Sequence, residues 1–508
     1  MLLFLPAAIL ALTVLALVAS NLQRGFRSSW LLALGGATLA FISLIYLRLQ
    51  LPQTTSFAFF GFGEGPHFFL TFVLDEFSWP LALLIVSLFA GALLGEVRQA
   101  ISAKWLSWAP GLVAAMACLL AVLSGDVLTT IFIWTLLDLV VYILLFTFIT
   151  NAAERQTALQ MLAVNLLASF LLLVAWTLSF YGQQLNQFVI LAAVVLRLGI
   201  LTPHLVLRAP QSLRADLSTM LLLTPAAAGI PLLARAGAML EPAGSLLLIL
   251  ILLPAVFCAA TWLFGPLQKS SAAYWDLGAG SLAAASAIGG QGSAALAFGM
   301  LMLAGRALLP LMQLTGRLRI PLAIIGSLFL SGLPYTFSHG AAGLFAELAW
   351  STPFLLLAYS AILAGWLRRA LGEEPLPLPA EPWMRTTQSL ASSVIPIVLV
   401  LLGLGLLPSF SARQTFPLWP ALVALIGAWS LFLFQRTVRF RIAPRPIQAL
   451  EWILSLRWLT LGIEFAGRLL ANLMAMLSSL LEGEAGILWA MLFMAFLLSL
   501  VGQFGLGG

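Results

Sequence analysis

The chain has 508 residues, of which 62% are apolar and only 8% are charged, and its mean hydropathy is +1.07. Soluble proteins carry about 25% charged and about 45–50% apolar residues. This composition therefore excludes a cytosolic enzyme, a nucleic-acid binder and a disordered chain. The net charge of +6 is typical of a membrane protein whose Lys and Arg gather in cytoplasmic loops.

The pattern of apolar runs predicts an all-α polytopic membrane protein with about 14–16 transmembrane helices. A helix needs about 20 apolar residues to cross the hydrocarbon core. The segments that meet this requirement are 2–19, 30–47, 68–94, 107–123, 126–149, 157–181, 187–203, 217–240, 244–265, 273–290, 293–314, 319–338, 350–370, 388–408, 416–435 and 485–502. The first lacks a basic leader and a clear cleavage site, which favours a spanning helix over a targeting peptide.

The Lys and Arg residues predict the orientation of these spans. We count 17 of them beside connections that follow odd-numbered spans and 3 beside the other connections. Because basic residues accumulate in cytoplasmic loops, we expect the N-terminus outside and the odd-numbered connections in the cytoplasm. The predicted location is the cell (inner or plasma) membrane.

The pattern changes after Arg445. Residues 447–483 contain no proline and few charges, and Arg457, Glu464 and Arg468 fall on one helical face. This favours a long amphipathic helix that lies along a membrane surface or a partner subunit. The alternative is two short apolar helices with a few pairing charges. The two cysteines lie inside apolar runs, which predicts small lipid- or core-facing residues and no disulfide or metal site.

Three charged residues stand inside predicted spans. Asp138, Arg197 and Arg306 are functional candidates because a charge at the bilayer centre costs roughly 2.5–3.5 kcal/mol or more. The alternative is a structural ion pair, such as Asp138 with Arg197, that locks two helices together. Asp75, Asp126 and Asp276 lie nearer the ends of spans, where a carboxylate can simply stabilise a helix N-terminus.

Two apolar spans contain helix breakers. Thr202-Pro203-His204 interrupts one and Gly332-Leu333-Pro334 interrupts another, five spans later. Interrupted helices at matching positions point to a transport site, so we predict two inverted five-helix repeats with broken helices. The predicted parts are N-terminal helices (1–105), a first repeat (106–240), a second repeat (241–370), further helices (371–446), and the amphipathic helix with the last span (447–508).

Several of these segments resemble one family. The segments that carry the resemblance are 74–78, 120–128 with Ile133-Trp134, 197–204, 214–235, 302–311 and 331–334. In order and spacing they resemble the proton-conducting antiporter-like subunits of respiratory complex I (NADH-quinone oxidoreductase), their counterparts in membrane-bound hydrogenases, and the Mrp cation/proton antiporters. The resemblance covers roughly residues 70–370.

The sequence departs from this family at its polar positions. Thr135 stands where the family has a Glu, and the nearest acid, Asp138, is almost one turn further along the helix. Arg197 and Arg306 stand where the family has Lys. Leu221 stands where a Lys or His is expected, and Met302 replaces a His. An Arg is effectively always charged, so neither arginine can accept and release protons as a Lys can.

The resemblance implies a subunit that translocates protons or Na⁺ within a larger membrane complex. We predict an ion pathway formed by Asp138 as the titrating carboxylate with Arg197, His204, Arg306, His339 and Glu347. The expected partners are other integral membrane subunits and the lipid bilayer, with no nucleic acid. No cofactor and no redox or hydrolytic site are expected in this chain. The alternatives are a structural or coupling subunit with a degenerate ion path, and a stand-alone transporter of a small organic solute.

Overall fold

The computed structural model describes most of the chain. The described ranges are 2–22, 29–60, 68–99, 107–179, 183–207, 215–240, 245–265, 272–313, 319–347, 350–372, 381–403 and 417–438, with scattered residues between 468 and 495. The chain divides into two compact units, Met1–Ile447 and Gln448–Gly508. All contacts described below lie within the first unit.

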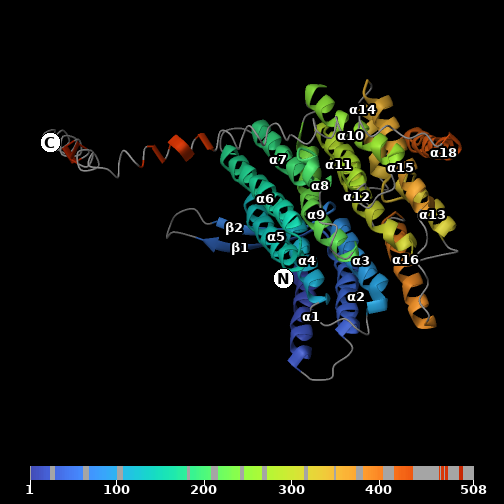
Figure 1. The fold of residues 1–508 in the computed structure, drawn as a ribbon, viewed down its shortest axis with the longest axis horizontal. Helices are drawn as coiled ribbons and strands as arrows, with labels where there is room; N and C mark the ends of the chain where they lie inside the picture. Colours follow the sequence, from blue (N-terminus) through green and yellow to red (C-terminus); the bar gives the residue numbers. More distant parts are fainter. Residues whose placement is uncertain are drawn as a thin grey trace. The chain divides into compact units, whose positions relative to one another are not determined.

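The first unit is built from helices that lie side by side (Figure 1). They are α1 (Leu5–Leu22), α2 (Ser29–Leu47), α3 (Ser78–Gly95), α4 (Ala109–Val122), α5 (Val127–Phe148), α6 (Ala152–Leu178), α7 (Gln183–Arg197), α8 (Pro203–Leu207), α9 (Ala215–Met239), α10 (Ser245–Phe264), α11 (Ala273–Ile288), α12 (Gly292–Gln313), α13 (Arg319–Leu330), α14 (Leu344–Glu347), α15 (Thr352–Gly372), α16 (Pro382–Gly403) and α18 (Trp419–Val438). Short 3₁₀ turns cover Leu2–Phe4, Arg48–Gln50, Glu96–Gln99 and His339–Gly343.

Many of these helices have the length and composition of membrane spans. Within the described ranges, ten helical segments are long and apolar enough to cross a membrane, and α4, most of α7 and α13 are shorter apolar helices. The prediction of a polytopic helical membrane protein is confirmed. The last predicted span, 485–502, and the amphipathic helix 447–483 lie mostly outside the described residues, although those described between 468 and 478 are helical.

The prediction that the third span begins at residue 68 is wrong. Strand β2 (Phe68–Leu74) pairs antiparallel with β1 (Gln53–Phe60), with Gln53 opposite Leu74. Aromatic and β-branched residues favour this extended pairing. The helix begins only at Ser78, because one carboxylate oxygen of Asp75 accepts the backbone N–H groups of Phe77 and Ser78.

The hairpin is fastened to the beginning of α5. The backbone N–H of Val73 donates to the carbonyl of Leu123 at 2.7 Å, and that of Gly125 donates to the carbonyl of Thr71 at 2.8 Å. The backbone N–H of Thr71 also donates to the Thr129 hydroxyl at 2.7 Å. The hairpin and the N-terminus of α5 therefore lie at the same end of the helical unit.

Small residues allow the central helices to approach closely. A Cβ atom on Gly305 of α12 would lie 2.0 Å from the ring of Trp275 on α11, and one on Gly237 of α9 would lie 2.8 Å from the Cα of Ala287. Small residues at helix contacts are typical of membrane proteins, since lipid offers no hydrophobic driving force between helices. In this core α12 packs against both α9 and α11.

Both predicted helix breaks are present. Helix α7 ends at Arg197, residues 198–202 form a turn in which Gly199 has φ +76°, and α8 begins at Pro203. Helix α13 ends at Leu330, and a turn containing Gly332 at φ +81° precedes the 3₁₀ turn at His339. Left-handed backbone of this kind favours glycine. The inverted repeats and the domain boundaries stay predictions.

Candidate functional site

Asp138 and Arg197 form a bidentate ion pair inside the protein. Arg197 donates from Nη1 to Oδ2 of Asp138 at 2.9 Å and from Nη2 to Oδ1 at 2.7 Å. Both side chains are completely buried. Paired N–H···O bonds of this geometry are the strongest kind of charged contact. The contact joins the middle of α5 to the last residue of α7.

Two further groups hold the Arg197 guanidinium in place. Its Nε donates to the carbonyl of Pro225 on α9 at 2.9 Å, and the guanidinium carbon Cζ lies 4.2 Å from the centroid of the Trp134 ring. Pro225 stands inside α9, and its missing N–H leaves the Leu221 carbonyl free. The Thr224 hydroxyl donates to that carbonyl at 2.9 Å. Arg197 therefore has partners other than Asp138.

A second charged pair connects α11 and α12. Nε of Arg306 lies 3.8 Å from Oδ2 of Asp276, and both side chains are partly exposed, at 19% and 18%. Asp276 was interpreted from the sequence as a charge near a helix end and was not paired with Arg306. The two residues lie at similar chain distances from the turn at Gly290, a signal that could have paired them, because α11 and α12 pack side by side.

A third cluster lies beside the hairpin. Nη2 of Arg235 lies 3.0 Å from Oδ2 of Asp75, and its Nη1 donates to the carbonyl of Ser124 at 2.7 Å. Asp126 accepts the backbone N–H of Thr129 at 2.5 Å and caps α5. The interpretation of Asp75 and Asp126 as charges at helix beginnings is confirmed, and Asp75 in addition binds α9 through Arg235.

The other predicted pathway residues are not joined to these pairs by any described contact. Nδ1 of His339 lies 3.3 Å from the carbonyl of Gly332, within the second helix break. The side chains of His204 and Glu347 lie outside the described residues, although their backbones belong to α8 and α14.

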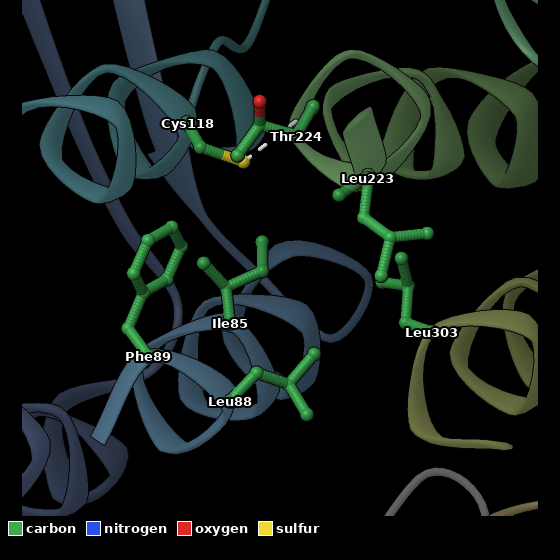
Figure 2. A pocket seen from close by; sticks show the side chains of 8 residues that line it. Ile85, Leu88, Phe89, Cys118, Leu223, Thr224 and Leu303 are labelled. Atoms are coloured by element: carbon green, nitrogen blue, oxygen red, sulfur yellow. Dashed lines mark hydrogen bonds between the residues drawn. The ribbon is translucent and has the colours of Figure 1, made fainter. Parts of the chain in front are cut away.

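The space between α3, α4, α9 and α12 is apolar (Figure 2). A small cavity there is lined by Ile85, Leu88, Phe89, Cys118, Leu223, Thr224, Ala227 and Leu303. Its polar contact is between Cys118 and Thr224, where the thiol donates to the backbone carbonyl at 3.6 Å. Leu221 and Met302 are buried as well. Both cysteines are free and buried, so of the two predicted environments they have the core-facing one.

Among the described residues, no cluster of three or more His, Cys, Asp or Glu side chains is arranged to hold a metal ion. The charged groups instead form arginine–aspartate pairs. Such pairs can bind and release a proton at the carboxylate while the arginine stays charged.

Solved structures share this fold, although no protein-family model and no curated protein sequence matches the chain. A chain of the Mrp complex from Dietzia sp. DQ12-45-1b has a TM-score of 0.71 at 16% identity, over 99% of this chain and 63% of that one. A chain of the membrane-bound sulfane sulfur reductase, an archaeal respiratory membrane complex, has a TM-score of 0.65 at 14% identity, over 98% and 99%. A chain of respiratory complex I from Thermus thermophilus has a TM-score of 0.59 at 22% identity, over 80% of this chain and 100% of that one.

The chain shares the fold of these chains of membrane complexes. The fold implied by the sequence resemblance is thus confirmed, and the protein spans about 63% of the length of the Mrp-complex chain that it matches. Within this fold, Asp138 and Arg197 form one ion pair, Arg306 pairs with Asp276, and His339 lies at the second helix break.

Proposed function

We propose that this chain is an antiporter-like membrane subunit that translocates protons, or Na⁺, within a multi-subunit complex of the respiratory NADH-quinone oxidoreductase or Mrp type. The observation that carries the proposal is the buried Asp138–Arg197 pair at the end of the broken helix α7. A charge pair at this depth is expensive to keep in a membrane and is a functional candidate for that reason.

In this proposal Asp138 is the group that changes its charge. When a proton binds to the carboxylate, the bidentate contact is lost and Arg197 keeps its positive charge. The Pro225 carbonyl and the Trp134 ring still hold the guanidinium. Arg197 then acts as a fixed positive charge, which the Asp138 carboxylate neutralises only when it is ionised. The unneutralised charge of Arg197 can drive the movement of the next ion along the path.

Transport measured in reconstituted membranes tests this role. The complex that contains this chain is purified through a tag on the chain, and ion pumping is compared for the native protein, Asp138→Asn and Arg197→Ala. We expect both variants to lose pumping. Thr135→Val is the matched control, because among the described residues the Thr135 hydroxyl donates to the Ile131 carbonyl of its own helix and to no other group. Unchanged coupling in both variants would contradict the assignment.

A second candidate is a structural or coupling subunit with a degenerate ion path. The apolar centre favours it, because Leu221, Met302 and the cavity lining supply no basic side chain between α9 and α12. Deletion of residues 447–508 distinguishes the two candidates. In a structural subunit the deletion breaks up the complex while the core spans remain inserted. An intact complex after this deletion counts against the structural role.

A further inference from the structure

The two intramembrane aspartate–arginine pairs differ in how fully the carboxylate is bonded. Both oxygens of Asp138 accept hydrogen bonds from Arg197. In contrast, Oδ2 of Asp276 is 3.8 Å from Arg306, beyond hydrogen-bond distance, and Oδ1 is buried without a hydrogen-bond partner among the described residues. A buried carboxylate oxygen without a partner destabilises the charged form, and binding a proton relieves this cost.

The helix contact around Asp276 is nevertheless firm. The indole Nε1 of Trp275 donates to the carbonyl of Met302 at 2.8 Å, and its ring packs on Gly305. Nε1 of Trp366 on α15 also donates to the Gly305 carbonyl at 2.9 Å. The backbones that carry Asp276 and Arg306 are therefore fixed next to each other. Only the contact between their charged groups is loose.

We propose that Asp276 is a proton-binding site, and that Arg306 sets the pH at which the proton binds. This inference rests on the proposed function, because it assigns Asp276 as a second carboxylate in the ion path. The step is the addition of one proton to the carboxylate, which changes the charge of the pair from zero to +1. Release of the proton restores the ion pair.

A proton fits this site better than a metal cation does. Hard cations bind through several oxygen atoms, whereas the described residues here supply one carboxylate that lies beside a permanent positive charge. The guanidinium would repel a bound cation.

Among the described side chains of the neighbouring helices, Arg306 forms the ion pair with Asp276. Helix α11 packs against α7, α8, α9, α10, α12 and α15. Helix α10 contributes no charged residue, only the buried Cys258 thiol. On α7, Arg197 is paired with Asp138, and on α9, Arg235 is paired with Asp75.

The arginines of α15 are also engaged elsewhere. Arg368 donates to the carbonyls of Leu263 and Gly265, and Arg369 lies over the Trp262 ring at 4.0 Å. The Tyr359 hydroxyl donates to the carbonyl of Leu330. The side chains of Asp216 on α9 and His204 on α8 lie outside the described residues.

Labelling with dicyclohexylcarbodiimide, which reacts with protonated carboxyl groups in apolar surroundings, tests the site without a transport assay. The intact complex in membranes is treated at a series of pH values, and adducts on the peptides that contain Asp276 and Asp138 are quantified by mass spectrometry. We expect the Asp276 adduct to form at low pH and to decline as the pH rises. Asp138 should be labelled less than Asp276 at every pH, because Arg197 donates hydrogen bonds to both of its oxygens.

Two variants test the part played by Arg306. Arg306→Gln removes an opposite charge, and this should raise the pH of half-maximal labelling by about one unit or more, since a neighbouring charge of opposite sign favours the ionised carboxylate. Arg306→Lys keeps the charge and should leave the profile close to the native one. Asp276→Asn should abolish the adduct, and Asp276→Glu should retain it.

The outcomes separate this inference from the proposed function. If Asp276 in the folded complex takes no adduct at any pH while the unfolded protein is labelled there, the site is overturned. If Arg306→Gln leaves the pH of half-maximal labelling unchanged, the role of Arg306 is overturned. If labelling behaves as expected but the complex pumps no ions, the proton site stands and the transport proposal fails.

Discussion

At the scale of single residues, the Asp138–Arg197 contact is the shortest of the charge pairs between described residues. Removing one partner from a buried pair leaves an uncompensated charge, which typically costs about 3–5 kcal/mol. We therefore expect Asp138→Asn to lower the free energy of unfolding by about this amount. Equilibrium unfolding in mixed detergent micelles measures it.

The double variant Asp138→Asn with Arg197→Met is the internal control for this prediction. Replacing both members of a buried pair removes the unpaired charge, so the double variant should be more stable than Asp138→Asn alone. If the two single changes simply add in the double variant, the two side chains do not form the buried pair described here.

At the scale of helices, the contact between α11 and α12 depends on Gly305. An added Cβ would lie 2.0 Å from the Trp275 ring, and overpacking of this kind typically costs about 1–3 kcal/mol. Gly305→Ala should therefore lower the thermal midpoint in detergent. Gly35→Ala is the matched control, because nothing lies within 4 Å of its Cβ position in α2. There the change should be neutral or stabilising by up to about 1 kcal/mol.

The break between α7 and α8 depends on Gly199 more than on Pro203. Gly199 has φ +76°, and an added Cβ would lie 2.3 Å from the side chain of Val206. Pro203 is the first residue of α8, where a missing N–H costs nothing. We expect Gly199→Ala to destabilise the protein and Pro203→Ala to be tolerated, as measured by thermal unfolding. A larger loss for Pro203→Ala would contradict this account.

The sequence predicted the helices and both breaks because long apolar runs and Gly or Pro act locally. It placed the second break at Gly332, which the structure confirms. The hairpin of residues 53–74 was missed because an apolar run of seven residues reads equally well as the start of a span. Asp276 was missed as a partner of Arg306 because pairing across two helices depends on their register and rotation, which the apolar pattern leaves open.

At the scale of the whole molecule, the charges lie in pairs around an apolar centre. The described part of the chain places Asp138 with Arg197, Asp276 with Arg306, and Asp75 with Arg235, while the cavity between α3, α4, α9 and α12 carries no charge. Two separate charge pairs, one in the middle of α5 and one in the first turn of α11, fit the two places where we propose that a carboxylate binds a proton. They do not supply a continuous row of basic side chains between them.

The orientation of the molecule in the membrane follows from the basic residues and from helix α5. The hairpin is hydrogen-bonded to Thr129 at the N-terminus of α5. Helix α5 has 22 residues and is therefore about 33 Å long, which is enough to cross a hydrocarbon core of about 30 Å. Ser56 in the hairpin and Asn151 after α5 should therefore lie on opposite sides. The basic residues predict that the Ser56 side is outside.

Labelling of single cysteines in intact cells checks this orientation. Cys118 and Cys258 are buried, so an impermeant maleimide should not reach them. Ser56→Cys should react in intact cells, and Asn151→Cys should react only after the membrane is opened, because both side chains are exposed but on opposite sides. The reverse pattern would contradict the orientation, and labelling of both positions in intact cells would contradict the crossing by α5.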